Sequence, residues 1–443
     1  NSSTLVSDYH ILKADNPFEK FKNFSPRGTE HEYDISHYKD KFYILTNLNA
    51  KNKRLMETNE DKTEISNWKE VIPHDDKIHL LSMSIFQNYI VINERKDGLR
   101  GLKIINQTSG KSHRMSFDED SYSARFSINE EFKTNILRYN YNSMTTPRST
   151  YDYNMDTREQ ILMKQQEVVG GYDQNLYLSE RIYVEARDGN LIPVSMVYRK
   201  DKKTDVPQNL LLYAYGSYGS TTDPYFSSTR LSLLDRGFIF AIAHVRGSQI
   251  YGRKSYKDGK LLNKKNTFED YIAVAKYLID KKYTSKGKVI GMGGSAGGLL
   301  MGAVVNQKPE LFLGIIMAVP FVDSLTTNLD HSLPLTVGEF DEFGNAKDNK
   351  EHFDYIYSYA PYHNIKKMDY PNILITTSLS DNRVLFDEPA KFTAKLREYK
   401  TDSNLLLLKT EMNAGHGGKS GRDGAIEEIS IDYSFAIKIS NPS

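Results

Sequence analysis

The chain has 443 residues, more than one ordinary hydrophobic core serves, so we expect two domains. Its 58 lysines and arginines nearly balance 57 aspartates and glutamates, and the formal net charge of +1 provides no broad field to attract nucleic acid or an anionic membrane. The absence of cysteine excludes disulfide bonds, thiolate metal sites and a cysteine nucleophile, and it fits a reducing compartment. No apolar run reaches membrane-spanning length, so we predict a cytoplasmic protein without nucleic-acid or membrane partners.

The first 170 residues consist of short strand-like runs separated by polar turns. Runs rich in β-branched and aromatic residues occur at 42–46, 89–93, 102–106, 134–139 and 160–163. Helical periodicity is missing, which favours a β-sandwich or propeller blades. At about 40–45 residues per blade, the segment could supply roughly four blades. We therefore predict a partial β-propeller segment over residues 1–170, although no sequence repeat marks the blades.

From residue 171 onward the pattern changes to that of an α/β domain. A hairpin signal at 181–198 comes first, centred on the turn 187–190. Continuous apolar runs then alternate with helical patterns, as expected of parallel strands covered on both faces. The strands are expected at 210–215, 238–245, 288–292, 313–319, 372–377 and 405–409, and the helices at 268–279, 387–399 and 426–437.

These elements predict a doubly wound α/β domain over residues 171–443, with ligands at the carboxyl ends of its strands. Thr267 and Asp270 resemble a capping box at the start of the first predicted helix.

The segment 289–300 carries the clearest chemical signal in the chain. A short apolar run ends at glycines, Ser295 stands among them, and a small apolar helical pattern follows. This is the G-x-S-x-G pattern of a nucleophile elbow, a sharp turn from strand to helix that exposes a serine hydroxyl. Gly293 and Gly297 remove Cβ atoms that would collide there, and the helix turns backbone N–H groups toward a developing oxyanion. The alternative is a glycine-rich turn with an incidental serine.

Two downstream residues supply the base and the acid that a serine nucleophile needs. Asp381 follows the predicted strand 372–377, and His416 follows the predicted strand 405–409. Both stand just past strand ends, in the order serine, acid, histidine that α/β-hydrolases use. Taken singly, a turn aspartate and a polar loop histidine are the alternatives. Together with the elbow, they predict a triad of Ser295, Asp381 and His416.

Other histidines do not compete for the role of base. The cluster of His31, Glu32 and His37 lacks zinc-ligand spacing and a third ligand. We therefore expect neither a metal nor a cofactor. The remaining candidates precede the last strands or lie on an apolar strand, where a satisfied core side chain is the simpler interpretation: His331, His363 and His244.

Several motifs together resemble the prolyl oligopeptidase family of serine peptidases, and within it the oligopeptidase B branch, which is specific for basic residues. The resemblance rests on the segments 293–300, 319–323, 336–345 and 415–422, and 137–147 and 245–247 extend it. It covers the chain from about residue 32 to near the C-terminus. Family members carry a complete β-propeller over an α/β-hydrolase domain. The resemblance thus implies that this chain, which begins at Asn1, lacks the N-terminal part.

Ser295, Asp381 and His416 match the catalytic triad of the family. The resemblance also assigns roles to residues outside that triad. The Tyr215 hydroxyl and the Ala296 N–H match the family's oxyanion hole, and a phenol at a strand end can donate to an oxyanion. A core or rim tyrosine is the alternative for Tyr215. The resemblance assigns substrate binding to Glu339, Asp341, Asp223, Arg383 and Phe321. Arg383 resembles an arginine that holds the substrate backbone, and a surface arginine at a helix start is the alternative.

Within that set, the resemblance gives Glu339 and Asp341 the role of receiving the arginine or lysine before the cleaved bond. A carboxylate binds a guanidinium bidentately, although a solvated acidic loop is the alternative. Asp223 matches a second acidic subsite, but Tyr225 and the segment 248–250 depart from the family pattern there. That departure leaves the preference at the second subsite open.

These observations predict a serine peptidase that cuts short basic peptides after Arg or Lys through an acyl-enzyme. One alternative is an α/β-hydrolase esterase or lipase with the same triad. A fat-binding pocket would have no use for Glu339 and Asp341, which favours the peptidase. A second alternative is a catalytically idle interaction fragment built on the first 170 residues.

Overall fold

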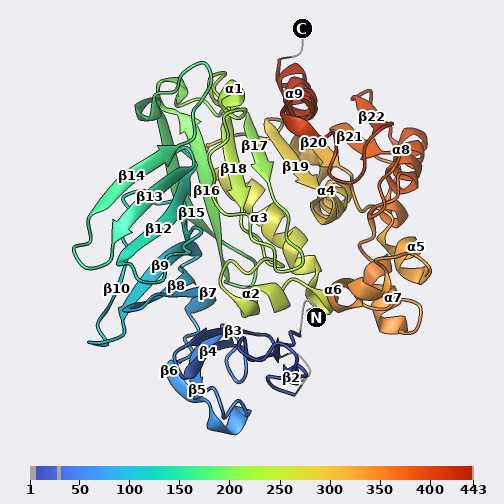
Figure 1. Ribbon diagram of the computed structural model, residues 1–443. Helices are drawn as coiled ribbons and strands as arrows, with labels where there is room; N and C mark the ends of the chain where they lie inside the picture. The colour runs from blue at the N-terminus through green and yellow to red at the C-terminus, as the bar shows by residue number, and fades with distance from the viewer. Residues whose placement is uncertain (1–5, 27–30, 442–443) are drawn as a thin grey trace. The chain divides into compact units, whose positions relative to one another are not determined.

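The computed structural model describes residues 6–26 and 31–441, which divide into two compact units (Figure 1). Asn1–Glu167 and Ile250–Lys254 form the first, here called the β unit. Val168–Gln249 and Ser255–Ser443 form the second, here called the α/β unit. A domain boundary between residues 170 and 171 stays a prediction.

The β unit consists of antiparallel strands with short connections. β3–β6, β7–β10 and β11–β14 form three successive four-stranded meanders, and parallel pairing of β9 with β11 joins the last two into one sheet. Its strands are β1 (His10–Ile11), β2 (Lys22–Asn23), β3 (Tyr33–Tyr38), β4 (Lys41–Thr46), β5 (Arg54–Asn59), β6 (Lys69–Ile72), β7 (Ile78–Ile85), β8 (Tyr89–Lys96), β9 (Leu99–Asn106), β10 (Ser112–Arg114), β11 (Tyr122–Phe126), β12 (Ile136–Ser143), β13 (Ser149–Asn154) and β14 (Gln160–Gln165).

The all-β prediction for this segment is confirmed, but the blade count differs. Three meanders form where length suggested roughly four, because the described residues before β3 contribute only the short pair β1 and β2. Turn chemistry sets the register locally. Asp97 and Gly98 both take positive φ, +51° and +78°, as a two-residue turn between twisted antiparallel strands requires.

The α/β unit is built on one eight-stranded sheet of order β15-β16-β18-β17-β19-β20-β21-β22. The predicted hairpin forms, β16 runs antiparallel to β18, and every later pairing is parallel. The strands are β15 (Tyr177–Glu185), β16 (Leu191–Arg199), β17 (Leu210–Tyr213), β18 (Ile239–Ala243), β19 (Val289–Gly294), β20 (Phe312–Ala318), β21 (Asn372–Ser378) and β22 (Leu406–Glu411).

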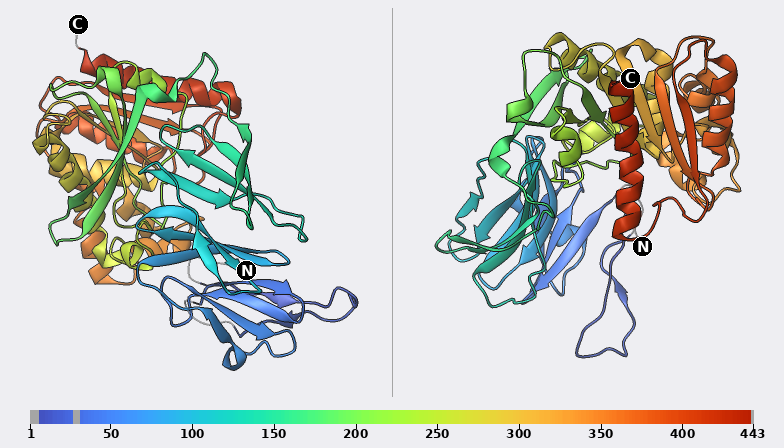
Figure 2. Two further views of the ribbon diagram at one scale, coloured as in Figure 1. Left: turned by 90° about the vertical axis from the view of Figure 1, so that its left-hand side faces the viewer. Right: turned by 90° about the horizontal axis from the view of Figure 1, so that it is seen from above.

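Helices cover this sheet on both sides. In the view from above, α8 and α9 lie on opposite sides of the last strands (Figure 2). The doubly wound α/β prediction is therefore confirmed. The helices are α1 (Leu231–Leu234), α2 (Arg253–Lys257), α3 (Lys265–Asp280), α4 (Ala296–Gln307), α5 (Ser324–Leu329), α6 (Phe340–Phe343), α7 (Lys350–Tyr357), α8 (Asp387–Tyr399) and α9 (Gly421–Ser440).

The capping box predicted at the start of α3 is wrong. The helix begins at Lys265, so Thr267 and Asp270 lie inside it. Both are buried and bind the loop after β18: the Thr267 hydroxyl donates to the Arg246 carbonyl oxygen (3.0 Å), and Asp270 accepts from the Arg246 N–H (3.0 Å) and its guanidinium. The two residues that resembled a local cap therefore form tertiary hydrogen bonds to Arg246 instead.

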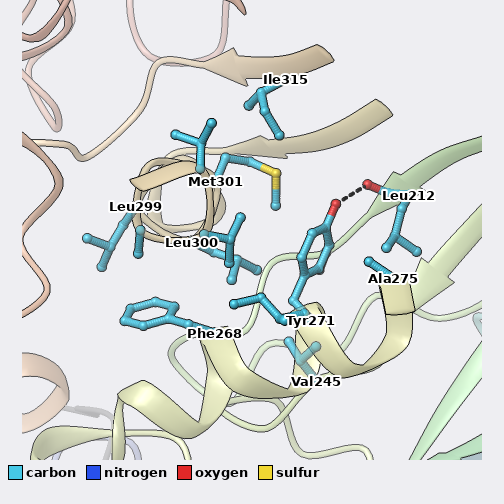
Figure 3. Packing of buried hydrophobic residues seen from close by; sticks show 14 of the residues in the cluster. Leu212, Val245, Phe268, Tyr271, Ala275, Leu299, Leu300, Met301 and Ile315 are labelled. Carbon is cyan, nitrogen blue, oxygen red and sulfur yellow. Dashed lines mark hydrogen bonds between the residues drawn. The ribbon is translucent and has the colours of Figure 1, made fainter. Parts of the chain in front are cut away.

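The core of the α/β unit lies where α3 and α4 pack on the central strands (Figure 3). Tyr271 is fully buried there, and its hydroxyl donates to the Leu212 carbonyl oxygen of β17 (2.7 Å). Gly291 of β19 leaves room for this ring, because a Cβ at that position would lie 3.0 Å from the Tyr271 hydroxyl. One hydrogen bond thus joins α3 to the strand that precedes the functional site.

Replacing Tyr271 with Phe should lower the unfolding free energy of the α/β unit by about 1 kcal/mol, because the buried donor is lost while the ring still packs. Urea titration followed by the helical circular-dichroism signal measures this loss. Tyr357→Phe, at an exposed position of α7, is the matched control and should stay within about 0.5 kcal/mol of the parent chain. Equal stability of the two variants would contradict the assigned role of the hydrogen bond.

Candidate active site

Ser295 lies at the sharp turn where the chain passes from β19 into α4. Its backbone angles, φ +56° and ψ −119°, fall in a region that side chains disfavour. Two hydrogen bonds hold this conformation: the Ser295 N–H donates to the Ala318 carbonyl oxygen (2.8 Å), and the Phe321 N–H donates to the Ser295 carbonyl oxygen (3.0 Å). The turn is therefore anchored to the end of β20.

Glycines make this turn possible, because backbone segments pass closer than a Cβ permits. A Cβ on Gly293 would lie 2.4 Å from the Gly297 carbonyl oxygen, and a Cβ on Gly297 would lie 2.9 Å from the Ala214 carbonyl oxygen. A Cβ on Gly298 would meet the Pro320 Cβ at 2.4 Å. The expectation that side chains would collide at 293 and 297 is confirmed, and both contacts are with backbone atoms that have little freedom to move.

The structure brings Ser295, His416 and Asp381 into one hydrogen-bonded chain. His416 Nε2 lies 3.1 Å from Ser295 Oγ, and His416 Nδ1 lies 2.7 Å from Asp381 Oδ2. Because an ionised carboxylate only accepts, Nδ1 carries the proton and Nε2 is free to accept one from the serine. The imidazole is thus held in the tautomer that a general base requires.

Asp381 is fully shielded from solvent and has a fixed orientation. Its side chain has 0% exposure. Beyond the bond to His416, its Oδ1 accepts from the N–H groups of Arg383 (2.9 Å) and Val384 (3.0 Å). The tight turn after β21 therefore points the second carboxylate oxygen at the histidine.

His416 lies on a glycine-rich loop after β22 that α9 supports. The Gly418 N–H donates to the Gly415 carbonyl oxygen (3.0 Å), which closes a turn around the histidine. The next residue, Lys419, donates its N–H to Glu428 Oε1 on α9 (2.8 Å). The C-terminal helix thus fixes the loop that carries His416.

A cavity of about 210 Å³ borders this loop, between the ends of β21 and β22 and α9. His416 and Asp432 both line it. Burial raises the pKa of Asp432 to about 7, Glu428 adds to the rise, and Lys409 opposes it. A buried carboxyl with a raised pKa therefore lines the same cavity as His416.

Tyr215 and Ala296 offer two hydrogen-bond donors close to Ser295. The Tyr215 side chain follows β17 and lies close enough to Ser295 for Ser295 to act on the pKa of its hydroxyl. Burial raises the pKa of the Tyr215 hydroxyl, and the nearby Ser295 opposes only part of the rise, so the phenol stays protonated. Ala296 is the first residue of α4, where a backbone N–H has no acceptor within the helix.

Glu339 is the predicted substrate-binding residue that the structure ties most closely to this site. It is half-buried just before α6, and its Oε1 accepts from the Tyr218 hydroxyl (2.8 Å). Burial raises the pKa of the Glu339 carboxyl. Both Glu339 and Arg383 are close enough to Tyr215 to act on its pKa, in opposite directions.

The other predicted substrate-binding residues occupy more varied positions. Phe321 follows β20 and packs its ring against Phe343, with ring centroids 5.4 Å apart. Arg383 and Asp341 are exposed, and Asp223 is half-buried in the loop after β17. Their roles in binding stay predictions.

Sequence reasoning missed three residues that the structure places beside these loops. Tyr218, with φ +58°, is the donor to Glu339. Lys264 and Glu342 are 1% and 2% exposed at their side chains and form an ion pair of 3.4 Å. In the sequence both stand beside residues of like charge, which resembles a solvated surface. The signal that the sequence offered was position along the chain: Glu342 stands close to Glu339, and Lys264 stands at the start of α3.

Three of the histidines set aside in the sequence have hydrogen-bond partners away from Ser295. His244 is buried and shares a hydrogen bond with Ser195 Oγ (2.9 Å), as expected of a satisfied core side chain. His37 pairs with Glu60 and His31 with a threonine of β4. Within residues 6–26 and 31–441, no group of three or more His, Asp or Glu side chains is arranged to hold a metal ion.

Comparisons with known proteins place these observations in a family. Residues 224–443 match the model of the prolyl oligopeptidase family, and residues 1–166 match the model of the prolyl oligopeptidase N-terminal β-propeller domain. The chain therefore belongs to the prolyl oligopeptidase family. Its fold is that of a β-propeller segment followed by an α/β-hydrolase domain, as the sequence predicted.

Individual relatives agree with this assignment. The chain is 44% identical to dipeptidyl aminopeptidase BI of Pseudoxanthomonas mexicana, covering 98% of this chain and 60% of the relative. It is 40% identical to protease 2 of Moraxella lacunata, covering 99% of this chain and 63% of the relative. The structure of oligopeptidase B from Leishmania major matches with a TM-score of 0.93 at 36% identity, over 99% of this chain and 63% of that one.

The chain thus spans somewhat less than two thirds of the length of these relatives. A separate feature concerns its helices. In the part of the chain that the structure describes, none combines the length and the apolar character needed to cross a membrane.

Replacing Gly293 with Ala should destabilise the α/β unit by about 1–3 kcal/mol and displace Ser295, because the new Cβ meets the Gly297 carbonyl oxygen. Denaturant titration measures the loss, and labelling of Ser295 by a fluorophosphonate reports the displacement. Gly338→Ala is the control, since nothing lies within 4 Å of a Cβ there. A Gly293→Ala chain as stable and as reactive as the control would disprove the steric account.

Proposed function

We propose that this chain is a serine peptidase that hydrolyses short peptides on the carboxyl side of Arg or Lys. The observation that carries the proposal is the hydrogen-bonded chain from Ser295 through His416 to Asp381, at 3.1 and 2.7 Å. These groups follow β19, β22 and β21, at the carboxyl edge where open α/β sheets bind ligands.

In the proposed reaction, Ser295 Oγ attacks the carbonyl carbon of the scissile bond while His416 Nε2 takes its proton. Asp381 holds the imidazolium through the bond to Nδ1. The C–N bond then breaks, and His416 returns the proton to the leaving amine. Water, activated by the same histidine, hydrolyses the acyl-enzyme and regenerates the Ser295 hydroxyl.

The negative charge on the carbonyl oxygen needs donors placed before the reaction. The Tyr215 hydroxyl is protonated and lies near Ser295, and the Ala296 N–H stands at the positive end of α4. A phenol and a backbone N–H in a desolvated site stabilise an oxyanion strongly, since neither has to reorganise.

Preference for a basic side chain would come from Glu339. Its carboxyl is half-buried, so its attraction for a guanidinium or an ammonium is screened less than it would be at the surface. The Tyr218 hydroxyl occupies one of its oxygens and leaves the other for the substrate. The names of the relatives, protease 2 and oligopeptidase B, agree with a peptide substrate.

Replacing Ser295 with Ala should abolish fluorophosphonate labelling and lower kcat for an arginyl p-nitroanilide by a factor on the order of 10⁶, because the nucleophile is lost. Ser430→Ala, at an exposed position of α9, should leave both unchanged. The parent chain should also prefer the arginyl substrate over an uncharged acyl ester. Preference for the uncharged ester would instead indicate an esterase, and a parent chain that does not label would indicate an idle fragment.

A second candidate is release of dipeptides from a free N-terminus. The relative with 44% identity, named dipeptidyl aminopeptidase BI, favours it. Paired substrates with arginine before the cut, one with a free amine and one with a blocked amine two residues upstream, separate the candidates. Cleavage of the blocked substrate supports an endopeptidase, and cleavage of only the free one supports the dipeptidyl activity.

Glu339 should make the preference for arginine pH-dependent. Burial raises the pKa of this carboxyl above its ordinary value, so the charge that binds the substrate is present at high pH and is lost as pH falls through the raised pKa. The ratio of kcat/KM for an arginyl ester to that for an uncharged ester should therefore fall on acidification. The ratio cancels the titration of the triad, which both substrates share.

Glu339→Gln should flatten this pH dependence and lower the ratio at high pH by about 10- to 100-fold, the range for one hydrogen bond to a charged group. Glu398→Gln, exposed on α8, removes the same charge elsewhere and should keep the parent profile. A Glu339→Gln chain that keeps the parent profile would exclude Glu339 as the receiving carboxylate.

A further inference from the structure

Lys264 is a buried cation that the proposed reaction does not use. Lys264 immediately precedes α3, and its side chain is 1% exposed. It contacts the residues that follow β17. Its Nζ donates to the Gly216 carbonyl oxygen (2.7 Å) and to Ser217 Oγ (2.5 Å), and it pairs with Glu342 Oε1 (3.4 Å). The three N–H groups of the ammonium thus have three acceptors.

These acceptors belong to the two segments that carry the proposed site. Gly216 and Ser217 directly follow Tyr215, the proposed oxyanion donor. Glu342 lies on α6, three residues after Glu339, the proposed receptor for the basic side chain. One side chain therefore joins the segment that stabilises the oxyanion to the segment that selects the substrate.

Further contacts leave little freedom to this junction. The second oxygen of Glu342 accepts from the Tyr256 hydroxyl (2.8 Å). On the other side, Gly216 has φ +74°, and a Cβ there would lie 2.4 Å from Thr267 Cγ2. Gly216 is thus packed closely against α3 while its carbonyl oxygen accepts from Lys264.

Stability alone gives a poor account of this arrangement. Burial lowers the pKa of Lys264, which records the cost of removing an ammonium from water, and Glu342 offsets only part of it. Buried ion pairs replaced by apolar residues of similar size often leave a protein equally stable or more stable. Three directional hydrogen bonds from one ammonium, in contrast, fix the positions of their acceptors relative to one another, which an apolar side chain does not do.

We propose that Lys264 is a positioning residue that fixes the Tyr215 segment and α6 relative to one another, so that oxyanion stabilisation and recognition of the basic side chain occur in one geometry. The inference rests on the proposed function, since it assigns Lys264 a part in that reaction. Tyr218 forms a second link between the same segments: it donates to Glu339, and its ring packs edge-on against Phe343 with centroids 5.8 Å apart.

The test compares Lys264→Met with the double variant Lys264→Met/Glu342→Gln in the full 443-residue chain. The single variant leaves a buried carboxylate unpaired and should lose stability, whereas the double variant removes both charges and should recover the parent melting temperature. Activity should not recover with it. In the double variant we expect kcat for the arginyl p-nitroanilide to stay at least about tenfold below the parent value, with a raised KM.

A double-mutant cycle with Tyr215→Phe identifies the route of the effect. In the parent chain, loss of an oxyanion donor should cost about 10²-fold in kcat. In the Lys264→Met/Glu342→Gln background, the same substitution should cost only a few-fold, because the phenol is already misplaced. Additive losses would show that Lys264 does not act through Tyr215 and would overturn the proposal.

Lys276→Met, an exposed lysine of α3, is the matched control and should keep parent kinetics. A double variant with parent stability, kcat and KM would reduce Lys264 to a structural residue. If neither lysine variant folds, Ser217→Ala carries the test: a several-fold fall in kcat supports the proposal, and an unchanged kcat overturns it.

The proposed function and this inference fail in different ways. A parent chain that does not prefer the arginyl substrate contradicts the proposed specificity. Lys264 is then judged on kcat for the uncharged ester, which uses the same oxyanion donors. A lowered kcat of the double variant on that ester supports the positioning role, and an unchanged one overturns it.

Discussion

The backbone of Ser295 is the constraint on which the rest of the site depends. A residue with a side chain at φ +56° costs of order 1–3 kcal/mol, and the conformation persists only where the surroundings fix it. Here the end of β20 and the residues after it fix the conformation. The Ser295 N–H donates to the Ala318 carbonyl oxygen, and the Phe321 N–H donates to the Ser295 carbonyl oxygen. The same geometry brings α4 against Ala214 so closely that Gly297 has no room for a Cβ. The backbone strain, the close packing and the position of the half-buried Ser295 hydroxyl are therefore consequences of one turn.

The parallel sheet explains how residues far apart in sequence meet at that turn. β19, β20, β21 and β22 are neighbours in order and parallel, so their carboxyl ends share one edge. The segments after β19, β21 and β22 each contribute one member of the proposed triad, and the segment after β20 anchors the serine. Each partner is in turn held by its own loop, Asp381 by two backbone N–H groups and His416 by a turn supported from α9. The register of the sheet thus sets the spacing that the proposed chemistry requires.

Sequence patterns predicted the parts of this structure that depend on local rules. The elbow, the order of the strands along the chain and the places of Asp381 and His416 after strand ends follow from glycine spacing and apolar runs. The capping box at Thr267 and Asp270 was wrong because both side chains bind Arg246 in the loop after β18. Lys264 was passed over for a related reason. A lysine beside another lysine resembles a solvated surface, and only the fold brings Gly216, Ser217 and Glu342 around it.

The two errors point to one structural principle, because both concern the first turns of α3. Thr267 and Asp270 anchor the loop after β18, and Lys264 anchors the loop after β17. Both anchors are buried, and both bind backbone atoms of the loop directly. Asp270 also binds the guanidinium of Arg246, so its contacts stay within the loop after β18 that it anchors. Lys264 also reaches Glu342 on α6, which lies far along the chain and belongs to the segment with Glu339. The start of α3 therefore fixes the two loops against the sheet, and through Lys264 it also fixes the segment that carries Glu339, the proposed receptor for a basic side chain.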